Sequence, residues 1–146
     1  MTGFRQYLSD LVYSGAVERL SAPTQVSLDI TRACNLKCVY CYAEAPHALR
    51  STQELTTAEL SRLIAHLGEI GVMELVIGGG EPFLRRDLLA LLKEAKDVGL
   101  SIYLISNGTA ITARKAAALR TILDGGDTIQ ISVDGPTAEV HESLRG

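Results

Sequence analysis

The sequence lacks an excess of basic residues, long apolar runs and enough cysteines for a disulfide framework. Fourteen Lys and Arg against 17 Asp and Glu give a formal net charge of −3, which excludes the basic footprint of a nucleic-acid-binding domain. Every apolar run is too short to span a bilayer. Arg5, Asp10, Glu18 and Arg19 interrupt the start of the chain, so a signal-peptide core is missing too. We therefore expect a cytoplasmic protein that binds neither nucleic acid nor a membrane.

The few cysteines that are present form one cluster, with Cys34, Cys38 and Cys41 in the spacing CxxxCxxC. An odd number so close together is a poor disulfide framework, because any pairing leaves one thiol over. Thiolates are soft ligands that suit zinc or an iron–sulfur cluster. Both sites normally take four protein ligands. Three cysteines would leave one iron of a cluster open, whereas zinc would need a further ligand such as His47.

Strand-like and helix-like segments alternate along the 146 residues, after an amphipathic segment placed at residues 1–23. Apolar alternation and short apolar runs predict strands over residues 25–31, 73–77, 100–105 and 128–133. Helices are expected from residue 56 to a stop at 71, over 85–98 and over 112–123. Thr56 and Glu59 form a capping-box pattern at the first of them, and the Arg85-Arg86-Asp87 run is expected at the solvated start of the second. The βαβαβαβ order predicts an α/β fold with a parallel sheet.

An unusual segment follows each predicted strand: CNLKCVYC, GGGEP, SNGT and VDGP. Ligands of parallel sheets bind at the carboxyl ends of the strands, so the four segments should meet at one rim. The glycines allow positive φ and close backbone approach, and no phosphate-loop lysine follows them. Ser106, Asn107, Ser132 and Asp134 are ordinary turn residues. Only their place on the shared rim makes them candidate polar contacts.

The motifs together resemble a known family. The cysteine spacing, with Tyr40 before the last cysteine, resembles the signature of the radical S-adenosylmethionine (radical SAM) superfamily, and Gly79 to Pro82 is similar to its GGEP motif. The ISVDG stretch from Ile131 and the HESLRG stretch from His141 are similar to one branch of it. That branch contains the molybdenum-cofactor cyclase, haem-maturation enzymes and SPASM-type peptide maturases. The resemblance implies a partial TIM-type (β/α) barrel with parallel strands, truncated after the fourth strand. Residues 24–146 would be the N-terminal part of the radical SAM core domain.

The resemblance also implies cofactors and site residues. A [4Fe–4S] cluster would be held by Cys34, Cys38 and Cys41, with its open iron binding the amino and carboxylate groups of SAM. The expected SAM contacts are Gly79, Gly80 and Glu81 at the amino group, Tyr40 near the adenine, and Ser106, Asn107 and Ser132 at the ribose or carboxylate. Reductive cleavage of SAM would give a 5′-deoxyadenosyl radical that abstracts hydrogen from a substrate. The implied role is peptide modification or cofactor and haem biosynthesis, with electrons from a donor such as flavodoxin or ferredoxin.

Three other functions compete with this hypothesis. A non-catalytic iron–sulfur electron carrier would use the same cysteines but gives no reason for a GGEP segment on their rim. The second alternative is a zinc-binding module, and the third is an inactive fragment of an enzyme. A full eight-unit barrel takes about 250 residues, so we expect this chain to be the front part of a longer domain. Its fourth strand would then present an open parallel edge.

Overall fold

The computed structural model describes residue 14, residues 20–43 and residues 54–146. One four-stranded parallel sheet has the order β1-β2-β3-β4. Its strands are β1 (Gln25–Thr31), β2 (Glu74–Gly79), β3 (Ser101–Ser106) and β4 (Thr128–Ile131). The connections contain α2 (Thr57–Glu69), the short 3-10 helix η2 (Pro82–Leu84) with α3 (Leu88–Asp97), and α4 (Ala113–Ile122), and α5 (Ala138–Arg145) follows β4. The predicted α/β fold and its parallel strand order are confirmed.

Two predictions fall on residues that the structure does not describe. The amphipathic segment predicted at residues 1–23 lies outside the described residues apart from residue 14 and residues 20–23. His47, considered as a further zinc ligand, lies outside them entirely. No helix in the described ranges is long and apolar enough to cross a membrane.

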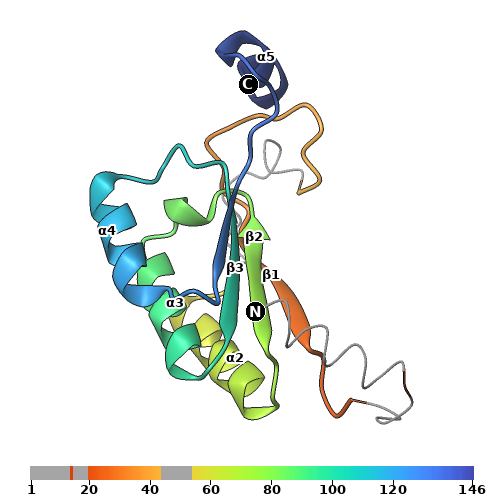
Figure 1. The fold of residues 1–146 in the computed structure, drawn as a ribbon, viewed down its shortest axis with the longest axis vertical. Coiled ribbons are helices and arrows are strands. Elements are labelled where there is room, and N and C mark those ends of the chain that lie inside the picture. The colour runs from red at the N-terminus through yellow and green to blue at the C-terminus, as the bar shows by residue number, and fades with distance from the viewer. Residues whose placement is uncertain (1–13, 15–19, 44–53) are drawn as a thin grey trace.

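The hydrophobic core lies between the sheet and the layer formed by α2, α3 and α4, which cover the same face of it (Figure 1). Alternate residues of the strands point into this layer because successive side chains of a strand face opposite sides. Leu75, Ile102 and Leu104 enter the core from the sheet, and Leu60 and Leu92 meet them from the helices, each 1% exposed or less. Burying one such side chain stabilises the fold by about 1.5–3 kcal/mol.

The first helix begins and ends as its sequence predicts. The Thr56 amide donates to Glu59 Oε2 at 2.8 Å and the Glu59 amide donates to Thr56 Oγ1 at 3.3 Å, which completes the capping box. At the other end Gly71 has φ 86°. Glycine adopts this left-handed conformation without a steric penalty, and so the chain can turn from α2 toward β2.

The prediction for the second helix was wrong at its start. The chain forms η2 and a bend before α3 begins at Leu88, three residues later than expected. Arg85 is extended, with φ −73° and ψ 130°, and its side chain is only 11% exposed rather than solvated. Its guanidinium donates to the Ile30 and Leu55 carbonyls at 3.0 and 3.2 Å and pairs with Asp87 at 2.6 Å. These bonds hold the end of β1 to the entry of α2, which a helical Arg85 on the surface would not do.

The last helix occupies a different place from the others. Figure 1 shows α5 beyond the carboxyl ends of the strands, beside the segment that follows β1. The Lys37 amide donates to the Arg145 carbonyl and the Val39 amide donates to the Leu144 carbonyl, each at 3.0 Å. The helix after β4 therefore contributes to the rim, while α2, α3 and α4 support the sheet.

Candidate functional site

The cysteine loop, residues 32–43, begins where β1 ends. Cys34, Cys38 and Cys41 are all free thiols and half-buried. Among the described residues, no group of three or more Cys, His, Asp or Glu side chains is close enough together to hold a metal ion. The donor set itself, three soft ligands on one short loop, is suited to a cluster with an open position.

The GGEP segment is joined to the cysteine loop through the backbone. The Gly80 amide donates to the Thr31 carbonyl and the Glu81 amide donates to the Ala33 carbonyl, both at 2.8 Å. A Cβ on Gly79 would lie 2.4 Å from the Thr31 oxygen, and one on Gly80 would lie 2.2 Å from the Ala33 oxygen. Gly79 also has φ 109°. Only glycine permits this approach, so the two glycines set the distance between the segments.

Glu81 connects the same segment to the loop after β3. The residue is completely buried. Its Oε1 accepts hydrogen bonds from the Phe83 amide at 3.0 Å and the Ser106 hydroxyl at 2.9 Å, and its Oε2 accepts from the Asn107 amide at 2.8 Å. Ser106 is itself only 2% exposed. The Glu81 carboxylate thus points into the protein and holds the loop after β3 in place.

A second link joins the loop after β3 to the cysteine loop. Asn107 Nδ2 donates to Asn35 Oδ1 at 3.0 Å, and Asn35 Nδ2 donates to the Thr109 hydroxyl at 2.8 Å. The Thr109 backbone amide donates in turn to Asn107 Oδ1 at 2.9 Å. Asn35 was not among the predicted site residues, although its position between two cysteines could have singled it out.

The segment after β4 completes the rim. The Ser132 amide donates to the Ser106 carbonyl at 3.0 Å and leaves Ser132 half-buried beside it. The Tyr40 hydroxyl is hydrogen-bonded to Asp134, which raises the pKa of Tyr40 and lowers the pKa of Asp134. Arg145 pairs with Asp134 and lies 5.7 Å from the centre of the Tyr40 ring. The structure therefore brings all four predicted loops to one rim, as expected. The individual roles of their residues stay predictions.

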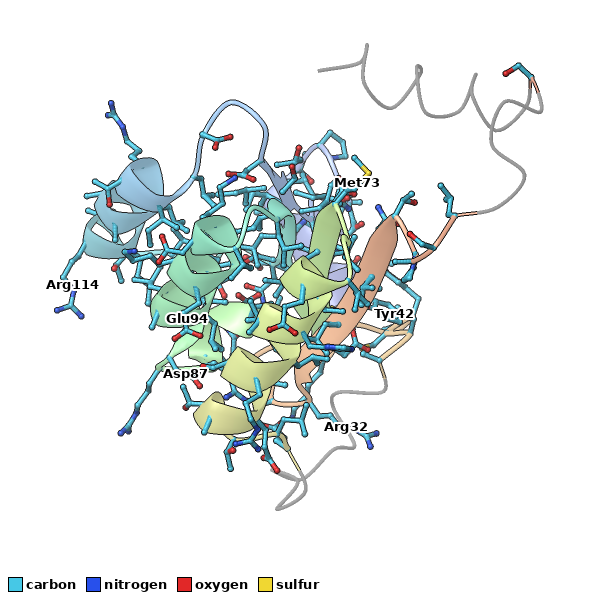
Figure 2. All side chains as sticks on the ribbon, turned by 90° about the horizontal axis from the view of Figure 1, so that it is seen from below. Arg32, Tyr42, Met73, Asp87, Glu94 and Arg114 are labelled. Atoms are coloured by element: carbon cyan, nitrogen blue, oxygen red, sulfur yellow. The ribbon has the colours of Figure 1, made fainter. Side chains whose placement is uncertain are left out.

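Tyr42 follows Cys41 as Tyr40 precedes it, and of these two flanking tyrosines the sequence favoured Tyr40 as the ring beside the ligand. Tyr42 lies beside β1 in Figure 2, near Gly78 and Asp29. Partial burial and the Asp29 carboxylate raise the pKa of Tyr42, against the opposing effect of a hydrogen bond from the Gly79 amide. Nothing in its local sequence marks this contact, because it arises from the cysteine loop turning back toward β2.

Comparison with protein families decides the assignment, because the model of the radical SAM superfamily matches residues 28–146. The chain belongs to the radical SAM superfamily. Membership confirms the cofactors expected from the sequence, a [4Fe–4S] cluster and SAM, which are those of the family. The matched region begins in β1 and includes all four rim segments.

Curated relatives come from the branch that the sequence indicated. The radical SAM chain is 40% identical over 121 residues to an AdoMet-dependent heme synthase of Oleidesulfovibrio alaskensis, covering 83% of this chain and 30% of the relative. It is 40% identical over 130 residues to a PqqA peptide cyclase of Bradyrhizobium diazoefficiens, and the match covers 88% of this chain and 33% of that relative. The chain thus spans about a third of the length of the curated relatives it matches.

Solved structures confirm the fold. SuiB of Streptococcus suis, crystallised bound to S-adenosylmethionine, superposes with a TM-score of 0.76 at 19% identity. The match covers 99% of this radical SAM chain and 32% of SuiB. The predicted partial TIM-type barrel is therefore confirmed, with the described strands forming its first part.

Proposed function

We propose that this radical SAM chain holds a [4Fe–4S] cluster on Cys34, Cys38 and Cys41 and binds SAM at the open iron. The pair of backbone hydrogen bonds from Gly80 and Glu81 to the residues just before Cys34 carries the proposal. Because those bonds set the spacing between the two loops, a ligand anchored on the cysteine loop would meet the Gly79–Glu81 backbone. Family membership supports the same assignment.

The donor set suits the proposed cluster. Three thiols supply the ligands, and a cluster that normally takes four cysteines then keeps one iron open. Held by Cys34, Cys38 and Cys41, the cluster would supply one electron for cleavage of the C5′–S bond of SAM into methionine and a 5′-deoxyadenosyl radical, which would take a hydrogen atom from the substrate. Thiolates rather than thiols bind iron, so cluster assembly releases protons from this loop.

The remaining rim residues position SAM. Asn107 and Ser132 are half-buried at the carboxyl ends of β3 and β4, where we place the ribose and the carboxylate. Ser106 is buried and bonded to Glu81, so it acts by holding the loop rather than by facing solvent. Tyr40 is proposed to border the adenine through its backbone, because its side chain is engaged by Asp134. Accurate placement of reacting groups is the main contribution a protein makes to such cofactor chemistry.

The relatives support a proposal about the substrate class. A heme synthase and a peptide cyclase are both about 40% identical to this chain. We propose that the whole protein acts in peptide modification or in haem or cofactor biosynthesis. Its electrons would come from a small cytoplasmic donor such as flavodoxin or ferredoxin.

The decisive experiment is anaerobic reconstitution with iron and sulfide, followed by reduction with dithionite and addition of SAM. Electron paramagnetic resonance should show a cluster signal that shifts when SAM is added, and chromatography should detect 5′-deoxyadenosine. A variant with Cys34, Cys38 and Cys41 all changed to alanine should bind no cluster, whereas a Gly125→Ala control should behave like the original. A cluster signal that SAM leaves unchanged would favour an electron carrier. Zinc in place of iron, or no cluster in folded protein, would contradict the proposal.

A further inference from the structure

Arg145, the last residue of α5, reaches back to the cysteine loop. Its Nη1 lies 3.7 Å from Cys38 Sγ and donates a hydrogen bond to the sulfur, across 107 positions in the sequence. The Arg145 side chain is 14% exposed. In the part of the chain that the structure describes, neither Cys34 nor Cys41 has such a hydrogen bond from a cationic side chain. The three proposed ligands are therefore not equivalent.

The backbone around Cys38 is also held to α5. The amides on either side of it, at Lys37 and Val39, donate to the carbonyls of Arg145 and Leu144, each at 3.0 Å. The end of α5 is thereby docked on the segment centred on Cys38. The contact between guanidinium and sulfur is part of this docking rather than an isolated surface contact.

The guanidinium itself is held by side chains of two other segments. Arg145 Nε pairs with Asp134 in the turn after β4, and the Tyr40 ring lies 5.7 Å from the guanidinium carbon. The Asp134 amide donates to His141 Nδ1 at 3.2 Å, which ties the turn to α5. Arginine is always protonated in proteins, so the charge of this guanidinium is permanent, and the contacts with Asp134 and Tyr40 orient it.

We infer that Arg145 is a positioning residue of the cluster site that donates a charge-assisted N–H···S hydrogen bond to the Cys38 thiolate and raises the reduction potential of the cluster. The inference rests on the proposed cluster site and adds a tuning element to it. Reduction adds one negative charge to the cluster, and a cation hydrogen-bonded to a ligand sulfur stabilises the reduced form more than the oxidised form. Hydrogen bonds to sulfur and solvent exposure are among the factors that set iron–sulfur potentials.

The test compares Arg145→Gln and Arg145→Lys with the unchanged protein after anaerobic reconstitution with iron and sulfide. The matched control is Arg114→Gln, at an exposed arginine on α4, away from Tyr42 in Figure 2. Iron and acid-labile sulfide are measured per chain, and the midpoint potential is obtained from a redox titration followed by electron paramagnetic resonance. We expect Arg145→Gln to shift the potential to more negative values. Arg145→Lys should shift it less in the same direction, because it keeps the charge but loses the rigid fork of donors.

Two negative results are distinguishable. A cluster with the same midpoint potential in both Arg145 variants and in the control would overturn this inference alone. Absence of any cluster in the folded, unchanged protein would overturn the proposed function and the inference with it. If Arg145→Gln takes up too little iron to titrate, Arg145→Lys decides the question, and an unshifted potential there counts against the hydrogen bond.

Discussion

Gly80 lies so close to Ala33 that the β-carbon of any other residue at position 80 would be 2.2 Å from the Ala33 carbonyl oxygen. The atoms that such a β-carbon would meet belong to the backbone of Arg32 and Ala33, which cannot move aside as a flexible side chain would. Ala33 directly precedes Cys34, and the Glu81 amide donates to the same carbonyl at 2.8 Å. This contact is where the cysteine loop and the GGEP segment meet.

Gly80→Ala should therefore displace the start of the cysteine loop. We expect a loss of about 1–3 kcal/mol in the free energy of unfolding, as for overpacked interiors, and weaker uptake of iron and SAM. Gly125→Ala is the control, because a Cβ there has no neighbour within 4 Å. Iron content after reconstitution and denaturant unfolding of both variants would measure the difference, and equal values would contradict the requirement for glycine.

Glu81→Gln tests the buried carboxylate. Glutamine keeps the shape but replaces one acceptor oxygen by an NH₂ group, which faces donors at Phe83 and Ser106 or at Asn107. A buried donor left without an acceptor costs about 1–3 kcal/mol, so the free energy of unfolding should fall by that amount. Glu94→Gln, on α3 in the helical layer (Figure 2), should have little effect. A Glu81→Gln protein as stable as the Glu94→Gln control would show that the carboxylate does not hold the loop.

Asp127 should be essential for stability although it lies away from the rim. Its side chain is 1% exposed and bonds Lys96 Nζ at 3.0 Å, the Ile102 amide at 2.7 Å and the Asp124 amide at 2.9 Å. Asp127→Ala removes the acceptor for all three donors, and we expect a loss of at least about 2 kcal/mol. Asp97→Ala, at a residue with a 58% exposed side chain, is the control. Urea unfolding monitored by circular dichroism measures both, and a loss no larger than that of the control would refute the expectation.

Docking of α5 should depend on pH through Asp134. The Tyr40 hydrogen bond and the Arg145 ion pair hold the pKa of Asp134 below its ordinary value near 3.8, and His141 contributes in the same direction. A carboxyl group whose pKa is lower in the folded chain than in the unfolded chain stabilises the fold at any pH above its unfolded-state pKa. This contribution is lost as the pH falls through the folded-state pKa. The gap in melting temperature between the unchanged protein and Asp134→Asn should therefore narrow from about pH 7 to about pH 3. A gap that stays constant would indicate that the Asp134 charge is not involved.

Local patterns in the sequence were enough to predict the sheet and its helices. The capping box at Thr56 and the glycine at Gly71 set the ends of α2, because caps depend on residues within one turn. All four strands in the described part of the chain were predicted, although their boundaries moved. β2 continues through Gly79 and β4 ends at Ile131, where strand pairing rather than propensity sets the limit. The second helix was placed too early because the partners of Arg85, at Ile30 and Leu55, are distant in sequence.

The sequence by itself was enough to indicate the radical SAM superfamily, since the cysteine spacing and the GGEP segment are readable along the chain without any tertiary structure. Parallel strands also required that the loops meet at one rim. Which residues touch there was decided only by the tertiary structure. Glu81 meets Ser106 and Asn107, and Arg145 meets Cys38, because the sheet and α5 bring together segments up to 107 positions apart. Alternation of apolar residues records which face of a strand is buried, but it carries no information about which polar partners meet at its end.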